Sequence, residues 1–149
     1  MKLLLYMALL LFVCFLPVQS TDVGKLIPVE VLAVSEQDGV VNVRTDTGNQ
    51  GKGNSIPEAF ADLKDTASGT IYLDTAEYLL LEPAMAENTA AFAAYLKSNT
   101  RICVAEEGIE LEGIAKYLSA HRPGVSLDRA SEVPAFPVIT GEDGRYWIR

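Results

Sequence analysis

Apolar and polar residues alternate over two neighbouring stretches of the chain, which predicts a β-hairpin. Residues 27–35 alternate and are rich in β-branched side chains. Asp38-Gly39 is a strong signal for a two-residue turn. In residues 40–47, Val41, Val43 and Thr45 fall on one face, and the residues between them are polar. The hairpin should therefore bury one face and expose the other.

A glycine-rich stretch and a helix should follow this hairpin. Residues 48–54 contain no apolar side chain, which predicts a flexible connection. Ser55-Ile56-Pro57-Glu58 is a capping box, with Ser55 at the N-cap, Glu58 at N3 and a proline in the first turn. Ile56, Phe60 and Leu63 then recur at helical spacing. We expect this helix to end at Gly69.

The rest of the chain predicts strands that alternate with helices. Tyr78–Leu81 and Arg101–Ala105 are continuous apolar runs, as expected for strands covered on both faces. Helical apolar stripes occur in a segment that Pro83 opens (Phe92, Ala93, Leu96) and in a later one (Leu111, Ile114, Ala115, Leu118). Residues 136–139 and 146–148 flank Gly141–Gly144 as a terminal hairpin. The order ββ-α-β(β)-α-β-α-ββ predicts an α/β (α+β) domain, with one mixed sheet, about three packed helices and a hairpin at each end.

The first 20 residues have the pattern of a secretory signal peptide. Lys2 is followed by an apolar run from Leu3 to Leu16, and Val18 and Ser20 fill the −3 and −1 positions of a cleavage site. The run is shorter than the roughly 18–20 residues that span a bilayer comfortably. We expect export with cleavage after Ser20, leaving a single globular domain over residues 21–149. Retention of the segment as a short N-terminal anchor is the alternative.

The charge of the chain excludes some partners. It has 20 acidic and 12 basic residues and a net charge of −8, which becomes −9 without Lys2. Such a domain is repelled by nucleic acid and by an anionic membrane surface. The acidity is concentrated between Glu58 and Glu112. We therefore expect no nucleic-acid binding and no direct binding of the acidic domain to an anionic membrane.

The two cysteines predict neither a lipid anchor nor a disulfide. Cys14 follows the bulky residues Phe12 and Val13, whereas small residues normally precede a lipidated cysteine. Removal of the first 20 residues would leave Cys103 alone, so no intramolecular disulfide could form. Cys103 stands between Ile102 and Val104, which favours a small buried residue.

No motif for catalysis, cofactor or metal binding stands out. Gly48–Gly53 lacks the hydroxyl that follows the lysine of a P-loop. His121 is expected to interact with the dipole at the end of a helix. Glu106, Glu107, Glu110 and Glu112 lack the spacing of a calcium loop. We therefore assign no catalytic, cofactor-binding or metal-binding residue and expect no cofactor.

The order of these segments resembles the N-terminal domain of the C-subunit proteins of bacterial spore germinant receptors, the Ger(x)C or GerAC-like family. The resemblance covers about residues 28–148 and is carried by five loose patterns: 29–35 with 38–43, 53–63, 71–73 with 78–81, 92–96 with 99–108, and 133–139. It implies a non-enzymatic subunit at the outer side of the inner spore membrane. Integral-membrane receptor subunits would be its partners.

The leading hypothesis is therefore an exported, non-catalytic domain that makes protein contacts at the outer face of the cytoplasmic membrane, in spore germination. Two other classes stay open. One is a small exported ligand-binding module with residues 48–54 or the acidic cluster at the mouth of a pocket. The other is a small exported hydrolase that uses His121 with Cys103 or a nearby carboxylate.

Overall fold

A computed structural model describes residues 3–7, 11 and 23–149 of the chain. Residues 3–7 are helical, and the leucines among them are exposed. The expected cleavage after Ser20 and the surroundings of Cys14 lie outside the described residues. Over the part of the chain that is described, no helix has both the length and the apolar character needed to cross a membrane.

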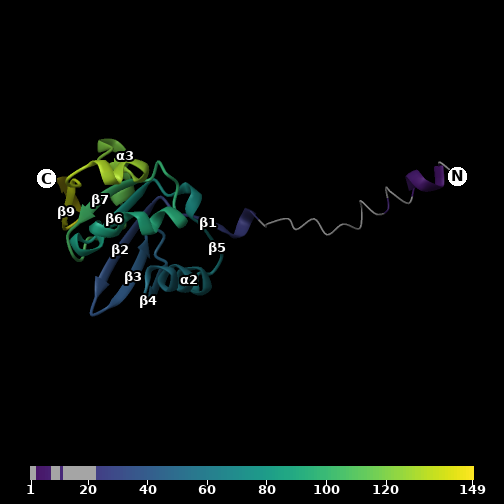
Figure 1. Cartoon of the computed structure of the whole chain (residues 1–149), viewed down its shortest axis with the longest axis horizontal. Coiled ribbons are helices and arrows are strands. Elements are labelled where there is room, and N and C mark those ends of the chain that lie inside the picture. The colour runs from purple at the N-terminus through teal and green to yellow at the C-terminus, as the bar shows by residue number, and fades with distance from the viewer. Residues whose placement is uncertain (1–2, 8–10, 12–22) are drawn as a thin grey trace.

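A mixed sheet organises the domain, with the strand order β10-β9-β7-β6-β2-β3-β4 (Figure 1). The bounds of these strands are β2 Val31–Gln37, β3 Val40–Thr45, β4 Gln50–Gly53, β6 Tyr78–Leu81, β7 Arg101–Ala105, β9 Val138–Glu142 and β10 Arg145–Ile148. The short strand β8 (Val125–Ser126) also pairs with β7. The central strands β2, β6, β7 and β9 are parallel to one another, whereas β3, β4, β8 and β10 pair antiparallel with their neighbours. The expected α/β (α+β) class with hairpins at both ends is confirmed.

Alternate residues of the central strands belong to two separate hydrophobic cores, one on each face of the sheet. On one face, Leu32, Leu79 and Ile102 join the buried side of helix α2 (Ile56–Thr66) and of the 3-10 turns η3 (Pro83–Ala94). On the other face, Leu80 and Cys103 pack under helix α3 (Ile114–His121). In Figure 1 α2 and α3 lie on opposite sides of the sheet. Strands covered on both faces explain the continuous apolar runs in the sequence.

The hairpin and the first helix follow the expected local signals. Asp38 and Gly39 both have positive φ, +52° and +77°, which gives the strands a turn of matching twist. The Ser55 hydroxyl accepts from the amide of Glu58 at 3.4 Å, and the Glu58 carboxylate accepts from the amide of Asn54 at 2.8 Å. The cap of α2 is therefore reciprocal, although Glu58 reaches one residue further back than in the standard box.

The glycine-rich connection expected at residues 48–54 is wrong, because Gln50–Gly53 form the edge strand β4. The two glycines of β4 face α2 so closely that side chains would not fit. A Cβ on Gly53 would lie 2.6 Å from the amide nitrogen of Ala59. Strand β4 thus packs through its backbone, and its sequence lacks the apolar residues by which strands are recognised.

Two further segments differ from the expected elements. The expected strand over residues 27–35 is broken, and its first part, β1 (Leu26–Pro28), pairs in parallel with β5 (Thr70–Tyr72) in a separate two-stranded sheet. The helix expected after Pro83 consists of 3-10 turns with a break at Asn88. Only Met85 and Phe92 of η3 are buried, too few side chains to hold a continuous α-helical stripe against the sheet.

The remaining described elements are short 3-10 turns that connect the strands. Their bounds are η1 Val23–Lys25, η2 Leu73–Thr75 and η4 Leu127–Glu132. The turn η2 carries the chain from β5 to the start of β6. It also forms part of the wall of a cleft.

Candidate functional site

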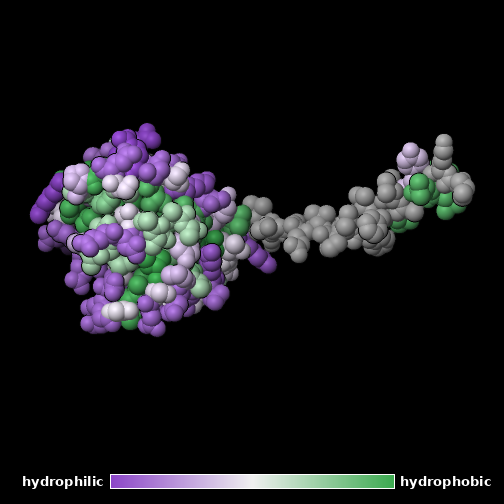
Figure 2. Space-filling model, in the orientation of Figure 1, coloured by the Kyte–Doolittle hydropathy of each residue, from purple (hydrophilic) through white to green (hydrophobic). Residues whose placement is uncertain are grey.

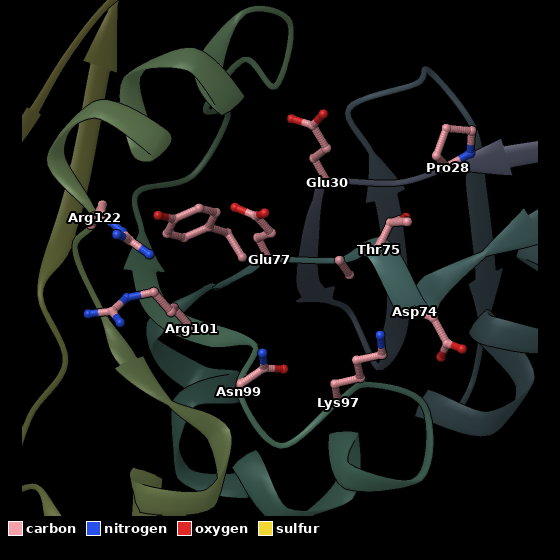
Figure 3. Close-up of a pocket in the computed structure, with 11 residues that line it drawn as sticks. Pro28, Glu30, Asp74, Thr75, Glu77, Lys97, Asn99, Arg101 and Arg122 are labelled. Carbon is pink, nitrogen blue, oxygen red and sulfur yellow. The ribbon is translucent and has the colours of Figure 1, made fainter.

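A cleft of about 610 Å³ opens at the edge of the sheet where the central parallel strands begin (Figure 3). Glu30 immediately precedes β2, Glu77 precedes β6, and Arg101 is the first residue of β7. Since these strands are parallel, their first residues lie at the same edge. The topology therefore gathers two carboxylates and a guanidinium that are far apart in the sequence.

Arg101 is held in place by the loop that follows α3. Its Nε donates to the carbonyl of Pro123 and its Nη2 to the carbonyl of Gly124, both at 2.9 Å. Two bonds from one planar guanidinium fix its orientation. The third nitrogen, Nη1, makes no hydrogen bond to any described residue and is free to bind a ligand.

Arg122 brings a second guanidinium to the cleft from the end of α3. It is the C-cap residue, and its amide donates to the carbonyl of Leu118 at 2.7 Å. Its backbone is left-handed, with φ +47° and ψ +48°. Glycine usually occupies such positions, because a Cβ is disfavoured there. Figure 3 shows the guanidinium of Arg122 on the same side of the cleft as that of Arg101.

Tyr78 also lines the cleft and is almost fully buried. Its hydroxyl donates to the carbonyl of Leu118 at 2.9 Å and so ties β6 to α3. Burial raises the pKa of this phenol, while Arg101 and Arg122 act to lower it and Glu77 acts to raise it. Both guanidiniums and one carboxylate are thus near enough to act on the same hydroxyl.

The rest of the cleft is lined by the acidic residues Glu30, Asp74 and Glu77, by Thr75 and by one further cation, Lys97 (Figure 3). The Thr75 hydroxyl accepts from the amide of Val29 and lies within hydrogen-bond distance of the Val29 and Tyr72 carbonyls, which holds η2 against the start of β2. The side chains of Glu30 and Glu77 have no hydrogen-bond or ion-pair partner among the described residues. The ion pairs found in the described part of the chain, Arg129–Glu132 and Arg149–Glu106, lie elsewhere.

The structure does not join His121 and Cys103. His121 lies at the end of α3, as expected. It is exposed, with its ring stacked on Tyr117 and its Nδ1 2.9 Å from the Tyr117 carbonyl. Cys103 has no exposed surface, and burial raises its pKa to about 12. The expectation of a buried Cys103 is confirmed. A thiol with such a pKa is a poor nucleophile near neutral pH.

The other candidate segments meet at a second, shallower hollow. Residues 48–50 and Glu112 line a space of about 410 Å³, together with Arg44 and Leu111. The glycine-rich segment thus adjoins one member of the acidic cluster. Within the described ranges no group of three or more His, Cys, Asp or Glu side chains is arranged to hold a metal ion.

Sequence reasoning missed the residues of the main cleft. Glu30, Glu77 and Arg101 belong to no local motif, because what unites them is their place at the starts of parallel strands. One signal was present: each of these charged residues directly adjoins the beginning of an apolar run. Arg122 carries a weaker signal, since it stands before Pro123-Gly124 where a glycine commonly ends a helix.

Comparison with known proteins gives no match. No family model, no curated protein and no solved structure matches the chain. The resemblance to the germinant-receptor family therefore stays a prediction from sequence patterns.

Proposed function

We propose that the protein is an exported, non-catalytic domain that acts through protein–protein contacts at the outer face of the cytoplasmic membrane. The signal-like N-terminus supports export. The resemblance to germinant-receptor C-subunits makes integral-membrane receptor subunits the proposed partners, in spore germination. The separation of buried Cys103 from exposed His121 supports a role without catalysis.

An alanine-rich surface over η3 is the observation that carries this proposal. Four alanines of these turns are exposed, Ala84, Ala90, Ala93 and Ala94, and Glu87 is the only charged residue of η3. Figure 2 shows a pale green area at the centre of the visible face, over the teal turns of Figure 1. Contiguous weakly apolar surface on an acidic domain is typical of a protein contact.

A groove beside these turns extends the surface. It has a volume of about 390 Å³ and runs between η3 and the start of α2, with Val41 and Met85 among its apolar lining residues. Asn54 and Asn88 add polar groups at its rim. Small side chains around a shallow groove allow close approach of a partner's backbone, as small residues do between packed helices.

The test compares two exposed alanines on opposite faces of the sheet. A photo-crosslinking amino acid at Ala93 in η3 should give an adduct with an integral-membrane protein in intact cells. The same group at Ala120 in α3, which is also exposed, should give none. In the chain without the crosslinking group, Ala93→Glu should impair germination, whereas Ala120→Glu should not. Equal labelling from both positions, or normal germination after deletion of the gene, would contradict the proposal.

A further inference from the structure

We propose that the cleft at the start of β2, β6 and β7 binds a small zwitterion, a molecule that carries one oxyanion and one ammonium group. This inference does not depend on the proposed protein contacts, because it concerns a different part of the surface. It rests on the opposed charges of the cleft and on the backbone conformation of Arg122.

One side of the cleft is built for an oxyanion. Arg101 and Arg122 both line the cleft and lie on the same side of it (Figure 3), yet no carboxylate of a described residue forms an ion pair with either guanidinium. Two nearby positive charges repel each other unless an anion lies between them. The planar guanidinium matches a carboxylate or a phosphate in shape and in hydrogen-bond geometry. Since two carbonyls already orient Arg101, little ordering is needed on binding.

The backbone at Arg122 gives an independent reason to assign this residue a binding role. A left-handed conformation costs a non-glycine residue roughly 1–2 kcal/mol. Glycine would cap α3 without that cost, but it would bring no charge to the cleft. Strain of this kind that persists is typical of ligand-binding positions.

The other side of the cleft is mainly acidic. Glu30, Asp74 and Glu77 line it together with one lysine, Lys97 (Figure 3), and neither the Glu30 nor the Glu77 carboxylate has a partner within the described structure. A simple anion would be repelled by the three carboxylates, and a simple cation would be repelled by the two arginines. A ligand with both charges satisfies both walls, and its ammonium group would lie against Glu77.

The size of the cleft limits the ligand to a small molecule. Its volume of about 610 Å³ falls within the roughly 300–1,000 Å³ of typical ligand sites. Two sources share the required chemistry. One is a free amino acid or short peptide, and the other is the phosphoethanolamine headgroup of a lipid.

The experiment measures binding by the full-length chain, purified in detergent, with calorimetry and thermal unfolding. The probes are the twenty amino acids tested singly, alanyl-alanine, and O-phosphoethanolamine. For any amino acid or peptide that binds, the N-acetylated derivative lacks the ammonium charge and the amidated derivative lacks the carboxylate charge. If phosphoethanolamine binds, the corresponding singly charged probes are ethanolamine, which lacks the phosphate, and inorganic phosphate, which lacks the ammonium group. We expect the zwitterion to raise the unfolding midpoint and each singly charged derivative to bind at least tenfold more weakly.

Variants connect the binding to the cleft. Arg122→Gln and Glu77→Gln should each weaken binding at least tenfold, Arg122→Lys should weaken it less, and the exposed Arg145→Gln on β10 should leave it unchanged. Unliganded unfolding midpoints show whether each variant is folded. If only amino acids or the peptide bind, the ligand is a free amino acid or a short peptide. If only phosphoethanolamine binds, the ligand is the headgroup of a lipid. No binding by any probe, equal binding of a singly charged derivative, or unchanged binding by both variants would overturn the proposal.

Discussion

Gly51 of β4 lies directly against the backbone of Leu63 in α2. A Cβ added to Gly51 would lie 2.7 Å from the Cα of Leu63, with the carbonyl oxygen of Ala59 and the amide of Leu63 closer still. All of these are backbone atoms on a helix that is itself packed on the sheet, so none can move aside as a flexible side chain would. The contact fixes the distance between the edge strand and its covering helix.

We therefore expect Gly51→Ala to destabilise the domain by about 1–3 kcal/mol, the usual cost of overpacking. Urea unfolding followed by circular dichroism measures the change. The control is Lys52→Ala on the same strand, whose exposed side chain makes no described hydrogen bond. A Gly51→Ala variant as stable as the control would show that β4 and α2 can separate without cost.

The same contact explains why the sequence predicted most strands but missed this one. Strands β6 and β7 are evident because their side chains fill two cores. Strand β4 contributes backbone instead, and glycine at such a strand looks like a loop in sequence. Side-chain patterns detect packing by side chains. They cannot detect an element that is held by backbone proximity and by pairing with β3.

The hydrogen bond from Tyr78 to the Leu118 carbonyl leads to a second prediction. The Tyr78 side chain is 3% exposed, and the Leu118 carbonyl also accepts from the amide of Arg122. Tyr78→Phe should cost about 1–2 kcal/mol of unfolding free energy, because a buried hydrogen bond between β6 and α3 is lost. Tyr72→Phe is the matched control, since Tyr72 is 40% exposed and its hydroxyl has no described partner. Equal unfolding midpoints for the two variants in a thermal melt would contradict this role.

Cys103 leads to a prediction about pH. Burial raises its pKa from 9.0 to about 12 in the folded chain. Below pH 9 the thiol is protonated in both the folded and the unfolded chain, so its contribution to the unfolding free energy has its full value. As the pH rises from 9 to 12, the unfolded chain loses the proton while the folded chain keeps it, and stability falls. Three pH units correspond to about 4 kcal/mol from this group.

The measurement is urea unfolding between pH 8 and pH 11 for two variants with Cys14→Ser, one with Cys103 and one with Cys103→Ala. The slope of stability against pH should be steeper when Cys103 is present. Iodoacetamide should label Cys103 only after unfolding, because the native thiol is neutral and inaccessible. Rapid labelling of the native protein at pH 8 would show that the thiol is exposed.

The charged cleft shows a second limit of sequence reasoning. Glu30 and Arg101 are 71 positions apart, and each resembles an ordinary charged residue beside a strand. Only the parallel pairing of β2, β6 and β7 places them at one edge. His121 and Cys103 attracted attention because their residue types are chemically distinctive, yet burial separates the thiol from solvent and from the exposed imidazole. Residue type identifies candidates, but topology decides which of them meet.

Substitutions of Arg122 test whether the left-handed backbone at the C-cap of α3 is strained, as its proposed binding role implies. At φ +47° and ψ +48°, glycine is free of the steric cost that any Cβ brings. Arg122→Gly should therefore be more stable than Arg122→Ala by roughly 0.5–1 kcal/mol, which reverses the usual order of these residues in helices. Both variants lack the guanidinium, so the difference between them reports the backbone alone. Chemical denaturation of the two proteins provides the comparison. If Arg122→Ala is the more stable, the left-handed cap carries no strain, and that support for the binding role of Arg122 is lost.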